Sequence, residues 1–529
     1  MRRWNGWGEE GAEPALPEPV RAYLAEQIGA AGAPREATLA EVTARLPATR
    51  CCPPGFVDDP ELRLRHAHGQ SFPDWVALRY GAVGAVADAV ALPAGHAEAA
   101  EALVAALRAG AIVIPYGGGT SVVGHLQVPD GDRPAVNISL SRCSTLLWLD
   151  EHAWLARLGA GATGPRLESQ LAARGFTLGH FPQSWQYSTL GGWVATRSSG
   201  QQSLRYDRIE QLFHGGRLAT PRGEWNVGGY PASAAGPDLR ECVLGSEGRL
   251  GLLTEATVRV RPLAEREDFH AVFFPEWESG LEAVRRITQA GIGLSMLRLS
   301  DAAETHISLR LAGDRKAVNW LRRYLGLRRL DRSPVLLLIG DTGSERMVLR
   351  ARRDALALAR PYGAVHVGRA LGRAWSAQRF AGPNLRNDLW RTGYGVDTVE
   401  TCTAWGRVTA LKTAIETAAQ QAFAAFGERV HCHTHLSHVY RQGCSLYTTF
   451  VFRLAGDPEL ELARWRAFKA AVSQALQALG ATISHQHGVG VDHAPYLAAE
   501  KGEIGIGLLR AIARELDPEG RMNPGKLFG

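Results

Sequence analysis

The stretch PYGGGTSVVGHL, from Pro115 to Leu126, places three consecutive glycines, then Thr and Ser, directly after a short apolar run. Glycine loses more backbone entropy on folding than other residues, so three in a row answer a specific structural need. The usual need is close approach of backbone N–H groups to an anion, commonly a phosphate. A plain turn would leave the same signature, so the surrounding sequence has to decide.

The residues before the glycines have the pattern of a strand, a helix and a second strand. VADAVALP (86–93) predicts a short strand, and HAEAAEALVAALRAG (96–110) has apolar residues at helical spacing with a glycine at its end. AIVIP (111–115) is β-branched and runs straight into the glycines. The loop therefore follows the second strand of a βαβ unit, whereas the glycines of a Rossmann fold follow the first strand.

Two further stretches of the same polar, glycine-punctuated kind follow at 181–212 and 244–263. Three such loops within one region predict a groove along an extended ligand. From about residue 266 the composition changes to Arg-rich helices alternating with strands such as DFHAVFF (268–274), so a different domain is expected there. Residues 1–74 are Pro-rich and predict helices broken by loops, with one helix near 18–31.

Length and composition bound the class of protein. The 529 residues exceed what one core needs, so two or more domains are expected. The net charge of +6 comes mostly from Arg, which suits anionic ligands, but no basic block indicates nucleic acid. Seven scattered cysteines argue for a reducing compartment. No apolar run of membrane-spanning length, signal peptide or targeting tripeptide is recognised, so a cytoplasmic location is expected.

Seven motifs together carry a family resemblance. They are RWNGWG (3–8), PYGGGTSV (115–122), QSWQYSTLGGWVATRSSG (183–200), GSEGRLGLLTEA (245–256), LRNDLW (385–390) with VDTVETCTAW (396–405), HLSHVY (435–440) with GCSLY (443–447), and SHQHGVG (484–490). In this order they resemble the vanillyl-alcohol oxidase and p-cresol methylhydroxylase superfamily of flavoproteins. Within it, the chain is most similar to the alkyldihydroxyacetonephosphate synthase family.

The resemblance implies an α+β fold with a two-part FAD-binding domain of the p-cresol methylhydroxylase and vanillyl-alcohol oxidase type. An α+β cap domain would be inserted into it, and a helical extension would precede it. The boundaries expected are 1–74 for the extension, 75–265 for the FAD-binding domain, 266–480 for the substrate (cap) domain, and 481–529 for a segment that returns to the FAD domain and active site.

FAD is the cofactor that the resemblance implies, held by four runs of residues. The residues expected to contact FAD are Pro115, Tyr116, Gly117, Gly118, Gly119, Thr120 and Ser121; Gln183, Ser184, Trp185, Gln186, Tyr187, Ser188 and Thr189; Thr196, Arg197, Ser198 and Ser199; and Glu247, Gly248, Arg249, Leu250, Gly251, Leu252 and Leu253. Several covalent relatives carry a histidine just after the glycine loop. This chain has Thr120 and Ser121 there, so the flavin is expected to be non-covalent, and contact with the later His125 is a minor alternative.

The same resemblance gives a catalytic set. Tyr447 matches the acid/base tyrosine of the family, and Arg386 matches the arginine that binds the substrate phosphate. His485 and His487 match two of three consecutive histidines, with Gln486 in the middle position, where an amide can hydrogen-bond but cannot titrate. To act as a base at neutral pH, Tyr447 would need neighbouring cations that lower its pKa. Without the family resemblance, the residues alone would indicate simpler roles. Tyr447 would be an aromatic side chain of the core, Arg386 would form a surface ion pair, and the two histidines would form a structural hydrogen-bonding pair.

The activity implied is exchange of the acyl group of acyl-dihydroxyacetone phosphate for a fatty alcohol, which forms the ether bond of an ether-lipid precursor without net oxidation. The alternatives are an FAD-dependent oxidase or dehydrogenase of a 2-hydroxy acid or a polyol phosphate, and a flavoprotein with an inactive site. The partners expected are lipid substrates, a membrane surface contacted peripherally, and a second copy in a homodimer; no nucleic acid is expected.

A histidine cluster in HCHTHLSHVY remains open to two interpretations. His431, His433 and His435 alternate along a predicted strand and would share one face, with His438 beyond them. Such a face can bind zinc, but no fourth ligand follows at a diagnostic spacing. Polar lining of the substrate pocket is the preferred interpretation, and no metal is expected.

Overall fold

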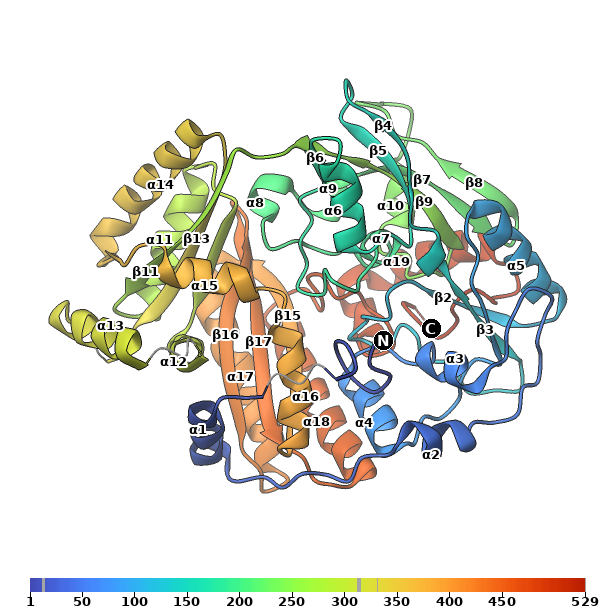
Figure 1. Ribbon diagram of the computed structural model, residues 1–529, viewed down its shortest axis with the longest axis horizontal. Coiled ribbons are helices and arrows are strands. Elements are labelled where there is room, and N and C mark those ends of the chain that lie inside the picture. Colours follow the sequence, from blue (N-terminus) through green and yellow to red (C-terminus); the bar gives the residue numbers. More distant parts are fainter. Residues whose placement is uncertain (12–14, 312–314, 331, 529) are drawn as a thin grey trace.

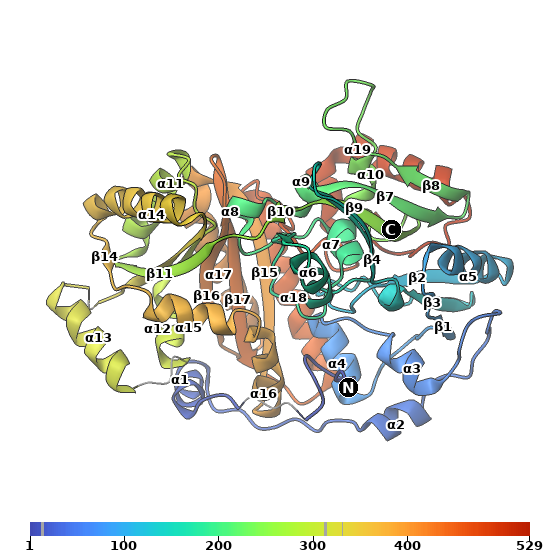
Figure 2. The ribbon, with the colours of Figure 1, turned by 45° about the horizontal axis from the view of Figure 1, so that its top comes forward.

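The computed structural model describes residues 1–11, 15–311, 315–330 and 332–528, and it arranges helices around three main β-sheets (Figure 1). Two of the sheets lie in the half of the molecule that carries the glycine loop, and the third lies in the other half (Figure 2). The fold is α+β, as the sequence predicts.

The glycine loop leaves a small parallel sheet. Its strands are β1 (Ala89–Ala91), β3 (Ala135–Ser139) and β2 (Ile112–Tyr116), in the order β1-β3-β2. Helix α5 (His96–Arg108) connects β1 to β2 and buries Ala99, Leu103 and Ala106 at helical spacing. The predicted βαβ unit is therefore present, although β3 lies between its two strands, which the local pattern did not indicate.

The second sheet is antiparallel and packs beside the first. Its order is β4 (Leu146–Asp150), β5 (Leu155–Gly159), β9 (Leu252–Arg259), β7 (Phe213–Thr220) and β8 (Gly223–Val227). Strand β9 lies within the third polar stretch, 244–263. Helices α6 (Gly164–Ala172), α7 (Leu190–Thr196), α9 (Ile209–Leu212) and α10 (Arg240–Val243) contact it, whereas α8 (Ser203–Tyr206) lies against the seven-stranded sheet. The buried side chains of both sheets form one continuous cluster.

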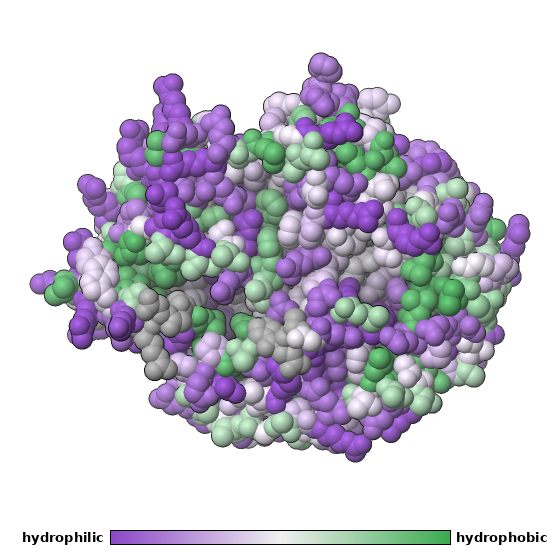
Figure 3. Space-filling model, viewed as in Figure 1, coloured by the Kyte–Doolittle hydropathy of each residue, from purple (hydrophilic) through white to green (hydrophobic). Residues whose placement is uncertain are grey.

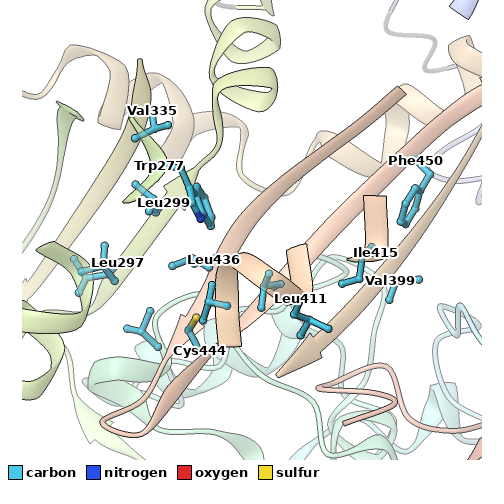
Figure 4. Close-up of a cluster of buried hydrophobic side chains, with 14 of the residues drawn as sticks. Trp277, Leu297, Leu299, Val335, Val399, Leu411, Ile415, Leu436, Cys444 and Phe450 are labelled. Carbon is cyan, nitrogen blue, oxygen red and sulfur yellow. The ribbon is translucent and has the colours of Figure 1, made fainter. Parts of the chain in front are cut away.

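The third sheet has seven antiparallel strands. Their order is β14 (Val365–His366), β11 (Arg266–Phe274), β13 (Val335–Gly343), β12 (Met296–Ser300), β16 (Val430–Val439), β17 (Gly443–Arg453) and β15 (Tyr394–Ala404). Helices α11 (Trp277–Gln289), α14 (Glu345–Ala359), α17 (Val408–Ala424) and α18 (Pro458–Ala478) contribute to the main hydrophobic cluster on one face. Figure 4 shows part of this cluster, with Leu299, Leu436 and Ile415 among its members.

Strand β13 shows why both faces of this sheet are apolar. Leu337 and Ile339 belong to the main cluster, while Leu336 and Leu338 belong to a second cluster on the opposite face. Because side chains alternate along a strand, a continuous apolar run fits a strand that is covered on both sides. The second cluster includes residues of α12 (Ala302–Leu311) and α13 (Arg315–Leu327), with α15 (Ala370–Gln378) packed against it.

The N-terminal residues run along the lower edge of the molecule in Figure 1 and connect its two halves. They form α1 (Glu18–Ile28), α2 (Leu39–Ala44), α3 (Pro60–Arg65) and α4 (Phe72–Tyr80). The predicted helix near 18–31 is α1, which ends at Gly29 with a positive φ of 95°. Asn387 of α16 (Leu385–Arg391) donates from Nδ2 to the carbonyl of Trp7 at 2.7 Å, so the motif RWNGWG packs on the motif LRNDLW.

The C-terminal residues return to the parallel sheet. Helix α19 (Ala494–Leu516) is kinked at Gly502, and the chain beyond it lies beside β2, where Met522 pairs with Val113. Asn523 donates from Nδ2 to the carbonyl of Glu247 at 2.7 Å. The end of the chain is thus fastened to the glycine-rich loops.

Candidate active site

A cavity of about 910 Å³ lies between the glycine-rich loops and the seven-stranded sheet. At one end, backbone and small side chains of the predicted FAD-contacting runs line it. At the other end, apolar side chains of α1, α12 and α15 line it, including Leu24, Leu309, Leu311 and Trp375. Between these ends lie Arg386, Tyr447 and His487. Sequence motifs far apart in the chain therefore meet around one space.

The first glycine loop presents free backbone donors. In the described part of the chain, the backbone N–H groups of Gly118, Gly119 and Thr120 donate to no other group. On the other side of the loop, Arg2 donates hydrogen bonds to the carbonyl oxygens of Gly118 and Gly119 and thereby holds the loop in place. Unpaired backbone N–H groups beside a cavity form a suitable cradle for a phosphate oxygen.

Close packing of two loops explains why this position requires glycine. A Cβ added at Gly118 would lie 1.9 Å from the carbonyl oxygen of Tyr187, and one added at Gly117 would lie 2.5 Å from Oγ1 of Thr189. Gly119 has a φ of +61°, which favours glycine. The three glycines therefore allow the second predicted run to pack directly on the first.

Not every predicted FAD-contacting residue reaches the cavity. The lining includes Pro115, Tyr116, Gly117, Gly118, Gly119, Thr120, Ser121, Gln183, Ser184, Ser188, Thr189, Thr196, Ser198, Glu247, Gly248, Gly251 and Leu253. It does not include Trp185, Gln186, Tyr187, Arg197, Ser199, Arg249, Leu250 or Leu252. Arg249 instead donates to the carbonyl of Met522 at 2.7 Å and lies over the ring of Phe528, so it fastens the C-terminal segment.

Glu247 connects the same segment to the loops. Its carboxylate accepts hydrogen bonds from the backbone of Val489 and Gly490, at 2.5 and 2.8 Å. Nε2 of His125 lies 3.1 Å from the same carboxylate, and Nδ1 of His125 lies 2.7 Å from Oγ of Ser121. Both ring nitrogens of His125 thus face protein groups at the cavity wall.

Tyr447 reaches the cavity because of strand alternation. On β17, Tyr447, Thr449 and Val451 line the cavity, whereas Leu446 and Phe450 point into the hydrophobic core behind the sheet. The ring of Tyr447 stacks on that of His435 across the strand pair, with centroids 4.9 Å apart. Burial raises the pKa of Tyr447 to about 12. The condition for Tyr447 to act as a base, a pKa lowered by neighbouring cations, is therefore not met, since desolvation of the phenolate outweighs the attraction of Arg386.

Arg386 stands on α16, beside Tyr447. It donates to the carbonyl of Gln70 at 2.8 Å, and its guanidinium lies 4.4 Å from the ring centroid of Trp75. Burial lowers the pKa of Arg386 to about 10, so the side chain is cationic at neutral pH. A fixed, charged guanidinium at a cavity wall suits an anionic ligand.

His485, Gln486 and His487 are organised by Glu400 of β15. Oε1 of Glu400 lies 3.2 Å from Nδ1 of His485 and 3.4 Å from Nδ1 of His438, while Oε2 accepts a hydrogen bond from the amide of Gln486. The neighbouring histidines hold the pKa of Glu400 well below its usual range. Gln486 and His487 line the cavity, but His485 lies outside its lining.

Both histidines of this loop are neutral at neutral pH. Burial lowers the pKa of His485 to about 4 and also lowers that of His487. Nε2 of His485 lies 2.8 Å from Nη1 of Arg208 and 2.6 Å from the hydroxyl of Tyr440. His487 places its ring at a right angle to Tyr447, with centroids 5.9 Å apart. His487 is thus the one positioned to exchange a proton with a ligand beside Tyr447.

Glu400, His438 and His485 bring one potential metal-ligating atom each to within 4.8 Å of one another. An arginine can only donate, so the contact with Arg208 requires a lone pair on Nε2 of His485. The proton of the neutral ring then sits on Nδ1, the atom that faces Glu400. Nδ1 of His485 and Oε1 of Glu400 lie 3.2 Å apart, as an electrostatic contact.

The histidines of strand β16 have separate environments. His433 and His435 line the cavity, and the ring of His431 packs against Tyr23. Among the described residues, no set of three ligating groups that includes any of these three meets within 4.8 Å. A bulge between Leu436 and Val439 interrupts the alternation and turns His438 toward Glu400. The structure favours the interpretation as polar lining for His433 and His435.

Sequence reasoning missed Glu400, Arg208 and Tyr440. Glu400 lies within VDTVETCTAW and Tyr440 ends HLSHVY, so both stood inside recognised motifs without an assigned role. It also missed the wall formed by Arg298, which donates to Glu304 at 2.6 Å and lies 3.1 Å from Nδ1 of His435. No spacing signal links these residues, because the fold brings them together from segments far apart in the chain.

The cavity suits FAD: unpaired amides for the pyrophosphate at one end, small residues where loops must approach closely, and length enough for a dinucleotide. The comparisons agree. Residues 87–228 match the model of the FAD binding domain, and residues 263–527 match that of the C-terminal domain of FAD linked oxidases. In the described residues, no helix is long and apolar enough to cross a membrane.

Relatives extend the similarity over nearly the whole chain. It is 31% identical over 484 residues to an alkyldihydroxyacetonephosphate synthase of Dictyostelium discoideum, covering 90% of this chain and 79% of the relative. A solved alkyldihydroxyacetonephosphate synthase superposes with a TM-score of 0.84 at 25% identity, covering 99% and 98% of the two chains. Substrate-bound p-cresol methylhydroxylase shares the fold, with a TM-score of 0.68 at 14% identity over 90% and 94% of the chains. The chain therefore belongs to the FAD-linked oxidase family, as a homologue of the alkyldihydroxyacetonephosphate synthases.

Proposed function

We propose that this protein exchanges the acyl group of an acyl-dihydroxyacetone phosphate for a fatty alcohol, with FAD bound non-covalently. The observation that carries the proposal is the composition of the 910 Å³ cavity. A cationic Arg386, the Tyr447–His487 pair and apolar side chains of α1, α12 and α15 line it together with the glycine-rich loops. Such a cavity suits a ligand with a phosphate head and alkyl chains.

The alkyl arm is built by the cap and by α1. Leu16, Val20 and Leu24 of the N-terminal region line the cavity together with Leu309 and Leu311 of α12. No motif predicted this arm, because its residues come from elements without a recognisable sequence signal. Burial of each methylene of an alkyl chain contributes about 0.8 kcal/mol, so such an arm strongly favours a lipid over a small hydroxy acid.

The acid and base roles follow from the pKa directions. Tyr447 keeps its proton at neutral pH because burial raises its pKa to about 12, so it can donate a hydrogen bond or a proton. His487 is neutral because burial lowers its pKa, so it can accept one. We assign removal of the proton α to the carbonyl to His487, the donor role to Tyr447, and the phosphate to Arg386.

The reaction balances without an external oxidant. The bond between the substrate carbon and the acyl oxygen breaks, and the bond between that carbon and the alcohol oxygen forms. The proton of the alcohol leaves with the fatty acid, and the α-proton that His487 removes returns to the same carbon. When bound, FAD supplies an electron-poor ring that can accept electron density from the substrate carbon. The two ring nitrogens of His125 already face Ser121 and Glu247, which supports a flavin without a covalent bond to this histidine.

Product analysis tests the proposal. Purified, FAD-loaded protein receives labelled hexadecanol and palmitoyl-dihydroxyacetone phosphate, and the expected result is an alkali-stable ether lipid, equal release of palmitate and no oxygen uptake. Absence of the ether from a yellow protein would contradict the proposal. Oxidation of a 2-hydroxy acid or a polyol phosphate is the second candidate, favoured by Gln486, whose amide removes one titratable group from the family's histidine loop.

A further inference from the structure

Helix α15 presents one side to the cavity and is followed directly by an arginine. The residues of the helix that line the cavity recur at helical spacing, and Arg379 lines it as well; they are Leu371, Ala374, Trp375 and Gln378. The helix packs against β11, and Figure 3 shows hydrophobic and hydrophilic side chains mixed over this half of the molecule, as helices with one apolar side produce. The side of α15 that faces the cavity is therefore apolar along the helix and cationic just beyond its end.

Three aromatic rings surround the guanidinium of Arg379. Its central carbon lies 5.0 Å from the ring centroid of Phe181, 5.7 Å from that of Phe269 and 5.0 Å from that of Phe380. Gln201 also donates to the backbone carbonyl of Arg379 at 3.4 Å. Aromatic faces attract a cation without neutralising its charge. The rings thus fix the position of the guanidinium and leave it free to pair with an anion.

No acid in the described part of the chain hydrogen-bonds to this guanidinium. Its ion-pair partner is Glu267, but Nη1 of Arg379 lies 3.9 Å from Oε1 of Glu267, which is beyond hydrogen-bonding distance. The other carboxylate oxygen of Glu267 accepts a hydrogen bond from Nε2 of Gln202 at 2.7 Å. Nη1 of Arg379 has no hydrogen-bond partner among the described residues, although the side chain is only 11% exposed. A largely buried guanidinium with a free donor at a cavity wall suits an anionic ligand.

The surroundings of Arg379 indicate which anion it would bind. The phosphate of the substrate is assigned to Arg386, seven residues later in the chain. Arg379 instead adjoins apolar side chains, because its neighbour Phe269 packs edge-on against the cavity-lining Trp375, with ring centroids 5.2 Å apart. A cation beside an apolar wall complements an anion that carries an alkyl chain.

We infer that Arg379 binds the carboxylate of a long-chain fatty acid. The inference rests on the proposed function for the source of this acid. When the bond between the substrate carbon and the acyl oxygen breaks, its electron pair remains on that oxygen as a carboxylate, and the proton lost by the alcohol balances this charge. Arg379 pairs with the carboxylate while the alkyl chain stays against Leu371 and Trp375. The residue therefore stabilises the leaving group and holds the released acid.

Binding of laurate and of its neutral amide, lauramide, to the FAD-loaded protein measures this contact without turnover. Calorimetry with the wild type is expected to show roughly 10- to 100-fold tighter binding of laurate, the factor that hydrogen bonds to a charged group supply. Arg379→Gln is expected to bind both ligands alike, with an affinity for lauramide near that of the wild type. Arg379→Lys keeps the charge but not the two-pronged geometry, so it is expected to keep part of the preference. No acyl-dihydroxyacetone phosphate is present, so a failure of ether synthesis would leave this result unchanged.

Two further variants are the controls. Arg373→Gln removes an exposed arginine of α15 that lies outside the cavity lining, and it is expected to bind laurate as the wild type does. Arg386→Gln is expected to keep the preference for laurate, because that arginine is assigned to the phosphate. FAD absorbance and the thermal midpoint confirm that each variant is folded and loaded.

Four results would overturn the inference. They are equal binding of laurate and lauramide by the wild type, an unchanged preference in Arg379→Gln, loss of the preference in Arg386→Gln, and weaker FAD binding by Arg379→Gln. The last result would assign Arg379 to the flavin and not to the fatty acid.

Discussion

The side-chain amide of Gln486 donates to Oε2 of Glu400, and this contact fixes the orientation of the amide. An ionised carboxylate only accepts, so the amide nitrogen must face Glu400. Oε1 of Gln486 then has no hydrogen-bond partner among the described residues. Gln486 therefore anchors the loop between His485 and His487 without adding a group that titrates.

Substitutions at Gln486 distinguish its role in anchoring the loop from the effect of a titratable group at this position. Gln486→Leu leaves Glu400 with one donor fewer and is expected to lower the free energy of unfolding by about 1.5–3 kcal/mol, the range for hydrogen bonds to charged groups. Gln486→His keeps a donor and is expected to stay near wild type in stability while adding a group that titrates in the pH–rate profile. Urea unfolding and the pH profile are the measurements; equal stability of the leucine and wild-type proteins would refute the anchoring role.

Gly118→Ala is expected to impair FAD binding severely. The new Cβ would lie 1.9 Å from a backbone carbonyl of the second loop, which can yield only if the loop moves. Gly95→Ala is the matched control, since an added Cβ there meets nothing within 4 Å. We expect at least tenfold weaker FAD binding for the first variant and no change for the second, measured by flavin absorbance per protein and by titration of the apoprotein. A fully yellow Gly118→Ala protein would show that the loops do not need this close approach.

Tyr447→Phe removes the hydroxyl and leaves the ring stacked on His435. The turnover number is expected to fall by about 10²–10⁴-fold, as for other general acids, with FAD content and stability unchanged. Because burial raises the pKa of Tyr447 to about 12, the wild-type rate should show no loss of this acid up to about pH 9. Tyr230→Phe, at a tyrosine that is 69% exposed, serves as control. A Tyr447→Phe rate close to that of wild type would remove this tyrosine from the mechanism.

The contribution of Asp492 to the free energy of unfolding depends on pH, and the sign of this dependence follows from its pKa. Burial raises its pKa from 3.8 to about 7, so the folded state holds the proton more tightly than the unfolded state. Stability contributed by this proton is full below about pH 3.8 and is lost as the pH rises through about 7. Asp492→Asn is therefore expected to stabilise the protein at pH 8, on the order of 1–3 kcal/mol, and to have little effect at pH 4. Asp130→Asn, at an exposed position, should change neither value; a larger gain at pH 4 than at pH 8 would reverse the sign and contradict the account.

The sequence was sufficient where a local pattern determines local structure. The helix at 96–108 and the strand before the glycines follow from local residue patterns, and the structure confirms them. The insertion of β3 between β1 and β2 could not be predicted, because strand order depends on contacts between distant segments. The motif order indicated the family and thereby the α+β fold.

The candidate site was less predictable, for a physical reason. Which residues meet around Glu400 depends on the register of β15, β16 and β17, and a lone Glu on a strand gives no signal of its own. The direction of the pKa of Tyr447 depends on the balance between desolvation and the charge of Arg386, which only the burial of the ring decides. The roles of Tyr447, His487 and Arg386 remain proposals that the variants above test.

The central claim is that the cavity exchanges two chains on one carbon without net oxidation, and anaerobic turnover tests it most directly. FAD-loaded protein, labelled hexadecanol and palmitoyl-dihydroxyacetone phosphate are mixed without any electron acceptor, while the flavin absorbance and the ether product are followed together. We expect many ether molecules per flavin, palmitate in equal amount, and a flavin that is oxidised when the substrates are exhausted. No ether, or a flavin that stays bleached after at most one turnover, would contradict the account.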